Sequence, residues 1–70
     1  MKRISVSSSM LKSVGYESLS QMLEVEFSNG DVWQYVGVPQ GVWNEMMESS
    51  SVGSYFHKNT KGNFTGTKVS

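Results

Sequence analysis

Residues 22–37 read Met-Leu-Glu-Val-Glu-Phe-Ser-Asn-Gly-Asp-Val-Trp-Gln-Tyr-Val-Gly, two alternating runs of apolar and polar residues separated by Asn29-Gly30. Alternation of this kind is typical of a half-buried β-strand, because successive side chains of a strand point to opposite faces. An Asn-Gly pair between two such runs is the strongest short-range signal of a β-hairpin. The stretch therefore predicts the antiparallel hairpin around which the rest of the chain is arranged.

The turn type decides which face of this hairpin is buried, because a shift of one residue inverts both faces. With a two-residue turn, Val25 pairs with Gln34 and the hairpin's two large aromatic rings are exposed. With a three-residue turn and Gly30 in the left-handed conformation, Val25 pairs with Trp33 instead. We favour the second register, because it buries no glutamine and gathers the large apolar side chains on one face: Leu23, Val25, Phe27, Trp33 and Tyr35.

Two further strands are predicted before the hairpin. Residues 3–7 alternate apolar and polar side chains, and residues 11–16 do the same around a glycine that a neighbouring segment can approach closely. The serine run at 7–9 breaks the pattern and is typical of a loop, since no glycine-rich phosphate-binding turn accompanies it. Together with the hairpin, these strands predict an antiparallel meander of three to four strands.

The chain after the hairpin predicts helices. Pro39 stops the sheet and suits the first turn of a helix, which we expect over residues 39–48. A second short helix follows the serines at 49–51 and ends before Asn59. Residues 63–70 are polar and glycine-rich, and we expect a flexible tail there, outside a single domain at residues 1–62. The predicted fold class is α+β: a small antiparallel β-meander with one face covered by one or two short C-terminal helices.

The composition gives little support to catalysis. A chain of 70 residues without cysteine forms one small core and has neither disulfides nor a thiolate nucleophile. His57 is the only histidine, so one chain cannot supply a two-histidine metal site. Glu24 and Glu26 share a strand face, but such a pair is more typical of a solvated face than of acid–base chemistry. We therefore expect no enzymatic activity, no metal site and no cofactor.

The chain shows no sign of a membrane or secreted protein. No apolar run is long enough to span a bilayer, and serines rather than a hydrophobic signal region follow the first residues. We therefore expect a cytoplasmic domain without a membrane partner.

The charges are unevenly distributed, although the formal net charge is zero. All basic side chains lie near the two ends of the chain, and all acidic side chains lie between them. If the termini meet in space, the fold has a basic and an acidic side. The predicted ligand contacts on the basic side are Lys2, Arg3, Lys12, Tyr55, His57, Lys58 and Lys61. Trp33 and Tyr35 resemble base-stacking platforms, but the favoured register buries both rings.

Several short motifs resemble a known family when taken in order: Val14-Gly15-Tyr16, Leu23-Glu24-Val25-Glu26-Phe27 followed by Gly30, Val38-Pro39, Val42-Trp43 and Val52-Gly53-Ser54-Tyr55-Phe56. They resemble the KTSC domain, which occurs at the C-terminus of some lysyl-tRNA synthetases and alone in small bacterial and phage proteins. The resemblance covers about residues 3–62. It implies an uncharacterised domain for which RNA binding has been suggested, and it supplies no catalytic site. The family's Tyr-x-Tyr is Trp33-Gln34-Tyr35 here, which argues against a role for the first tyrosine's hydroxyl.

Two classes of function follow. The first is a non-enzymatic binding domain for RNA or tRNA, which uses a basic patch formed by the two chain ends. The alternative is a protein-interaction module, either a homodimer or a phage or bacterial protein that binds and modulates a host enzyme or a nucleotide signal. Methionine-rich surfaces suit such docking, and the candidate patch is Met10, Trp43, Met46 and Met47.

Overall fold

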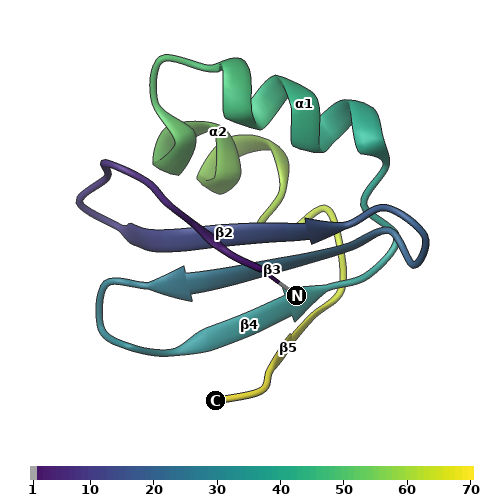
Figure 1. Cartoon of the computed structure of the whole chain (residues 1–70), viewed down its shortest axis with the longest axis horizontal. Helices are drawn as coiled ribbons and strands as arrows, with labels where there is room; N and C mark the ends of the chain where they lie inside the picture. Colours follow the sequence, from purple (N-terminus) through teal and green to yellow (C-terminus); the bar gives the residue numbers. More distant parts are fainter. Residues whose placement is uncertain (1) are drawn as a thin grey trace.

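The computed structural model describes residues 2–70. In that part of the chain, one antiparallel sheet holds five strands in sequence order: β1 (Ile4–Ser5), β2 (Leu11–Glu17), β3 (Met22–Phe27), β4 (Val32–Tyr35) and β5 (Gly66–Lys68). The helices α1 (Gln40–Glu48) and α2 (Val52–Asn59) lie between β4 and β5 in the chain and cover one face of the sheet (Figure 1). The predicted α+β class, the meander and the helical cover are confirmed.

The β3–β4 hairpin has the register of the three-residue turn. Val25 lies opposite Trp33, and Gly30 has a φ of 97°, in the left-handed region. The backbone N–H of Phe27 donates to the carbonyl of Asp31 at 2.8 Å and closes the bulge. The alternative register with a two-residue turn is therefore excluded. The bulge directs the large apolar side chains of both strands toward the helices.

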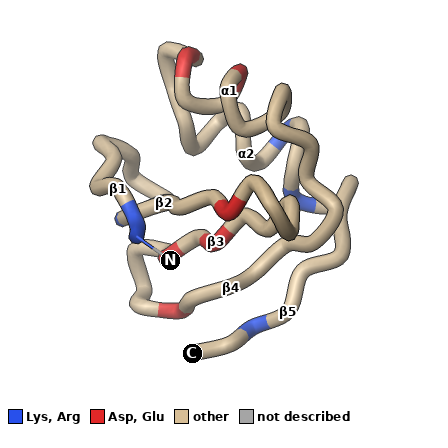
Figure 2. Tube along the Cα trace, turned by 45° about the vertical axis from the view of Figure 1, so that its right-hand side comes forward, with Lys and Arg blue, Asp and Glu red and all other residues tan. Residues whose placement is uncertain are grey.

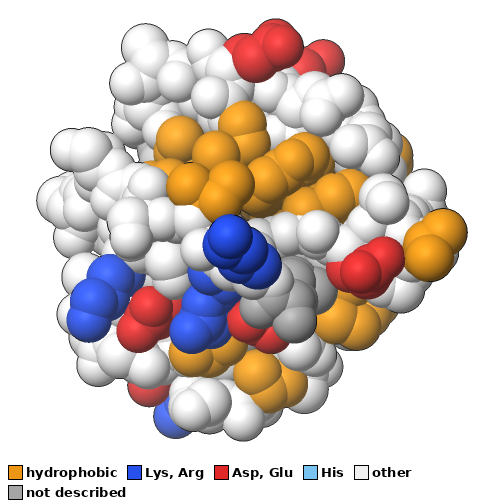
Figure 3. Space-filling view, viewed as in Figure 1, with side chains coloured by type: hydrophobic (Ala, Val, Ile, Leu, Met, Phe, Trp, Pro, Cys, Tyr) orange, Lys and Arg blue, Asp and Glu red, His pale blue; other side chains and the backbone are white. Residues whose placement is uncertain are grey.

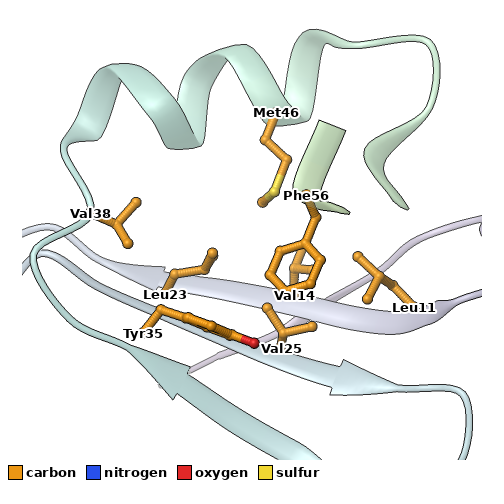
Figure 4. Close-up of a cluster of buried hydrophobic side chains, with 8 residues drawn as sticks. All are labelled: Leu11, Val14, Leu23, Val25, Tyr35, Val38, Met46 and Phe56. Atoms are coloured by element: carbon orange, nitrogen blue, oxygen red, sulfur yellow. The ribbon is translucent and has the colours of Figure 1, made fainter. Parts of the chain in front are cut away.

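The core lies between the sheet and the helices. Figure 4 shows a cluster of its buried members, which come from β2, β3, β4, both helices and the connection before α1: Leu11, Val14, Leu23, Val25, Tyr35, Val38, Met46 and Phe56. The ring of Phe56 makes edge contacts with Phe27 and Tyr35, at centroid distances of 5.7 and 5.4 Å. Helix α2 is thus anchored on the aromatic side chains of the hairpin.

Aromatic stacking attaches α1 to the sheet at a second point. The ring of Trp43 lies parallel to that of Tyr16, with 5.5 Å between centroids and 11° between planes. The hydroxyl of Tyr16 donates to the carbonyl of Val38 at 2.5 Å. Met46 is fully buried, whereas Met47 is half-buried, so the methionines of α1 are divided between the core and the surface.

The last residues of the chain have a place in the sheet. The sequence predicts a flexible tail at residues 63–70. In the structure, β5 lies within this segment, pairs with β4 and places Gly66 opposite Tyr35. A Cβ at Gly66 would overlap the Tyr35 ring, so the glycine lets this ring lie against the edge strand. The N–H of Val69 donates to the carbonyl of Val32 at 2.8 Å. The domain boundary at residue 62 stays a prediction, but the sheet itself extends beyond it.

Candidate functional site

A pocket of about 480 Å³ opens beside the hairpin turn. Its lining comes from the hairpin and from the segment between α2 and β5: Phe27, Asn29, Asp31, Trp33, Tyr35, Lys61, Gly62, Phe64 and Gly66. Neither helix contributes to this lining. The pocket therefore forms where the helical cover ends and the C-terminal segment crosses back to the sheet.

Four aromatic side chains form the apolar part of the pocket. The rings of Trp33 and Tyr35 lie nearly parallel, 6.5 Å apart between centroids. Tyr35 is 4% exposed, and its burial raises the pKa of its phenol, so the ring is uncharged at neutral pH. Trp33 and Phe64 are only half-buried. Tyr35 is thus buried as expected and contacts Phe56 of α2, whereas the expected burial of Trp33 is only partial.

Lys61 and Phe64 reach the pocket from a tight turn after α2. The backbone N–H groups of Thr60 and Lys61 both donate to the carbonyl of Phe56, at 3.0 and 2.9 Å, and end the helix. Gly62 has a φ of 97°, a conformation that favours glycine and reverses the chain. The turn thus brings one cation and one aromatic ring to a pocket whose other walls belong to the hairpin.

The polar part of the pocket comes from the hairpin turn. The side-chain oxygen of Asn29 accepts from the backbone N–H of Asp31 at 3.0 Å, and its Nδ2 lies 3.4 Å from Asp31 Oδ2. Asp31 Oδ1 lies 3.6 Å from the ammonium of Lys68, and the Asp31 side chain is 37% exposed. A carboxylate and an amide therefore lie side by side at the rim and remain accessible to a ligand.

The basic residues of the two chain ends do not separate from the acids as the sequence suggests. Arg3 Nη1 lies 3.0 Å from Glu24 Oε2, and its Nη2 lies 3.9 Å from Glu26 Oε1. At the other end, Lys68 pairs with Asp31. Figure 2 shows the basic segments at β1 and β2, around α2 and on β5 rather than in one place. The sheet therefore brings Arg3 and Lys68 next to acidic side chains, and the two chain ends do not form a purely basic side.

The two glutamates on the open face of the sheet are occupied by protein groups. Gln34 Nε2 donates to Glu24 Oε1 at 2.8 Å, and Ser13 Oγ donates to Glu26 Oε1 at 2.9 Å. With the ion pairs to Arg3, each carboxylate has two partners. These contacts fix the N-terminal segment across β2 and favour a structural role for the pair.

Arg3→Ala should lower the free energy of unfolding by about 1 kcal/mol, because it leaves two half-buried like charges without their cation. Urea unfolding measures the change. The matched control is Lys2→Ala, which removes the exposed cation next to it and should change stability by less than about 0.5 kcal/mol. Equal changes in the free energy of unfolding of the two variants would contradict the ion pairs assigned to Arg3.

The other predicted contact residues lie on or after α2. The hydroxyl of Tyr55 donates to Glu45 Oε1 at 2.7 Å, a bond that raises the pKa of Tyr55 and ties the two helices together. His57 and Lys58 are exposed in the last turn of α2. Of the predicted cationic and stacking contacts, Lys61 lines the pocket, whereas Lys2, Arg3 and Lys12 belong to the N-terminal side of the sheet.

Six residues of the pocket lining are not among the site residues predicted from the sequence: Phe27, Asn29, Asp31, Gly62, Phe64 and Gly66. Asp31 belongs to the predicted hairpin, and Phe64 lies in the segment expected to be a flexible tail. The available signal was the alternation of β-branched residues over positions 65–69, which is typical of a strand. A strand there would have indicated that Phe64 lies next to the sheet.

Among residues 2–70, no group of three or more His, Cys, Asp or Glu side chains is arranged to hold a metal ion. Over the same range, every helix is too short or too polar to cross a bilayer.

Comparison with known sequences identifies relatives of two sizes. The KTSC domain family model matches residues 7–64. An uncharacterised protein of Stutzerimonas stutzeri (strain A1501) is 43% identical over 58 residues, which cover 83% of this chain and 82% of that protein. A lysine–tRNA ligase of Trichormus variabilis is 42% identical over 62 residues, 89% of this chain but 11% of the ligase. This chain thus corresponds to most of the small relative and to a minor part of the large one.

A solved structure has the same fold. The crystal structure of a KTSC domain protein from Yersinia pestis superposes with a TM-score of 0.92 and is 37% identical in sequence. The superposition covers 99% of this chain and 97% of the other. The resemblance inferred from the motifs is therefore confirmed over the whole sheet and both helices. The chain belongs to the KTSC domain family.

Proposed function

We propose that this chain is a non-enzymatic binding domain for single-stranded RNA, in which an unpaired base enters the pocket and stacks on Trp33. The observation that carries the proposal is a pocket lined by four aromatic residues and by Lys61. Its volume of about 480 Å³ is within the range of small-molecule sites. Proteins recognise single-stranded RNA by stacking splayed-out bases on aromatic rings in this way.

The cations of the α2 segment are the proposed phosphate contacts. Lys61 is exposed and lines the pocket, and Lys58 is exposed in the last turn of α2, close before it in the chain. Arg3 is engaged by Glu24 and Glu26, which makes the N-terminal end a poorer partner for phosphate. Because the formal net charge is zero, most of the affinity has to come from stacking rather than from long-range attraction.

The relatives suggest which RNA to use first. Proteins named lysine–tRNA ligase contain a segment similar to 89% of this chain, and the substrate in that name is a tRNA with single-stranded loops and a single-stranded end. We therefore propose tRNA as the first natural ligand to compare with short single-stranded RNA.

The double substitution Lys58→Ala/Lys61→Ala should weaken binding of single-stranded RNA and reduce the slope of log affinity against log salt by about 1 to 2, because up to two phosphate contacts are lost. Fluorescence anisotropy of a labelled RNA, titrated at several salt concentrations, measures both quantities. Far-ultraviolet circular dichroism verifies that the variant is folded.

The matched control is Lys2→Ala/Lys12→Ala, which removes the same charge from the N-terminal side of the sheet and should leave the salt slope unchanged. A larger loss in this control would favour the N-terminal cations over the pocket as the RNA contact. No binding by the unmodified chain at about 50 mM salt would overturn the RNA proposal.

A protein-interaction module is the second candidate. Figure 3 shows a band of apolar side chains across one face of the molecule. Met10, Trp43 and Met47, three of the four residues of the patch suggested by the sequence, pack against the core while staying half-buried. Met46 is fully buried and does not belong to this surface. A concentration-dependent dimer in light scattering, with no RNA bound, would favour this candidate.

A further inference from the structure

We infer that the pocket prefers guanine to the other three RNA bases and that the carboxylate of Asp31 makes this choice. The inference rests on the proposed RNA function and specifies the base for the same site. It comes from the polar part of the lining, which stacking on the aromatic rings does not use.

Asp31 and the stacking ring lie on the same side of the hairpin. Asp31 and Trp33 are two positions apart along an extended segment, so their side chains point to one face, and both line the pocket. A base stacked on Trp33 would therefore have Asp31 beside it in the lining of the same pocket.

The backbone of Asp31 is held in place, and its carboxylate is free to accept further hydrogen bonds. Its backbone is held by the bulge bond from Phe27 and by the bond from its N–H to Asn29. The ion pair with Lys68 is long, at 3.6 Å, and leaves the side chain 37% exposed. Each carboxylate oxygen accepts two hydrogen bonds, so acceptor positions remain for a base.

Guanine is the base whose Watson–Crick edge fits a carboxylate. It presents two adjacent donors, N1–H and the 2-amino group, and a carboxylate accepts two parallel N–H bonds of this kind. Adenine, cytosine and uracil each present one donor group there, beside ring nitrogen or carbonyl acceptors that repel the negative charge. Hydrogen bonds to an ionised acceptor are about twice as strong as neutral ones, so the difference in favour of guanine is large.

The amide of Asn29 extends the match. Its Nδ2 lies 3.4 Å from Asp31 Oδ2, so a donor group lies next to the carboxylate. The amide has two N–H groups, and the second one is available to a ligand. Guanine has its O6 acceptor next to N1–H, which is the complementary order of acceptor and donors. The pair Asn29 and Asp31 thus presents the arrangement that a guanine edge requires.

The test uses short labelled RNAs that differ at one base. Each is a uridine tract with a central guanine, adenine, cytosine, uracil or hypoxanthine, and affinity is measured by fluorescence anisotropy at low salt. We expect the guanine RNA to bind about tenfold more tightly than the other natural bases. The hypoxanthine RNA should bind with intermediate affinity, because that base keeps N1–H and lacks the 2-amino group.

Asp31→Asn preserves the shape of the side chain and removes its charge. This variant should lose the preference, binding the guanine RNA more weakly and the other RNAs as well as or better than the unmodified chain. An unfolded variant would bind every RNA more weakly. Weaker binding of the guanine RNA together with unchanged or stronger binding of the other RNAs therefore identifies a change in specificity. The control Glu48→Gln neutralises an exposed acid at the end of α1 and should keep the preference for guanine.

The outcomes separate the two proposals. Equal affinity of the unmodified chain for all the RNAs would overturn the guanine inference and leave the RNA function standing. A preference for guanine that persists in Asp31→Asn would also overturn it, because another group would then recognise the base. No binding of any RNA at low salt would overturn the proposed function itself.

Discussion

Phe56→Ala should leave most of the protein unfolded at 25 °C. The Phe56 side chain is fully buried and contacts the rings of Phe27 and Tyr35. Replacing a buried phenylalanine by alanine costs about 3 to 5 kcal/mol, from lost burial and from the cavity left behind. A domain of this size has a free energy of unfolding of only a few kcal/mol, so the loss is comparable to the whole. Circular dichroism and urea unfolding measure the result.

The matched control for Phe56→Ala is its neighbour on α2. His57 is exposed, and His57→Ala should change the free energy of unfolding by less than about 0.5 kcal/mol. Phe56→Leu keeps most of the apolar volume and should give a folded protein with a measurable, smaller loss. A Phe56→Ala variant that unfolds within about 1 kcal/mol of the parent would contradict the packing of α2 against the hairpin.

Trp33→Leu should weaken binding of single-stranded RNA about 5- to 150-fold. A base stacked on an aromatic side chain contributes about 1 to 3 kcal/mol, which corresponds to that range of affinity. Leucine preserves apolar contact with Tyr35 and removes the flat surface on which a base stacks. Anisotropy titrations of the guanine-containing RNA measure the loss, and urea unfolding verifies that the variant is folded under the conditions used.

The same substitution at the other tryptophan is the control. Trp43 stacks on Tyr16 at the α1 end of the sheet and lies outside the pocket lining. Trp43→Leu should therefore lower stability and leave RNA affinity unchanged. If Trp43→Leu reduced affinity while Trp33→Leu did not, the RNA contact would be the half-buried surface of α1, and the pocket would have another role.

The hairpin could be predicted in detail because its signals are local. Gly30 provides the left-handed residue that the bulge needs. Because side chains alternate between the two faces of a strand, the register of the hairpin then determines the face on which every large side chain lies. The helices were predictable for a similar reason, since Pro39 and Ser51 mark where each one begins. Both signals act within a few residues of the structure that they determine.

The pocket could not be predicted because it depends on contacts between distant segments. Phe27 and Phe64 both line it only because β5 pairs with β4. The alternation of β-branched residues over positions 65–69 indicates a strand, but it does not indicate which strand is its partner. The charges follow the same rule. Arg3 and Glu24 are hydrogen-bonded although 21 positions separate them in the sequence. The order of charges along the chain therefore does not predict which cations and acids the sheet brings together.

The central claim is that RNA occupies the pocket containing Trp33, and the two tryptophans of the chain allow a direct measurement. In a ¹H–¹⁵N correlation spectrum each indole N–H gives one signal, and the Trp43→Leu variant assigns them. Adding single-stranded RNA should shift the Trp33 signal progressively and leave the Trp43 signal in place. A shift confined to Trp43, or saturation of the RNA-bound state with both signals unmoved, would contradict the account.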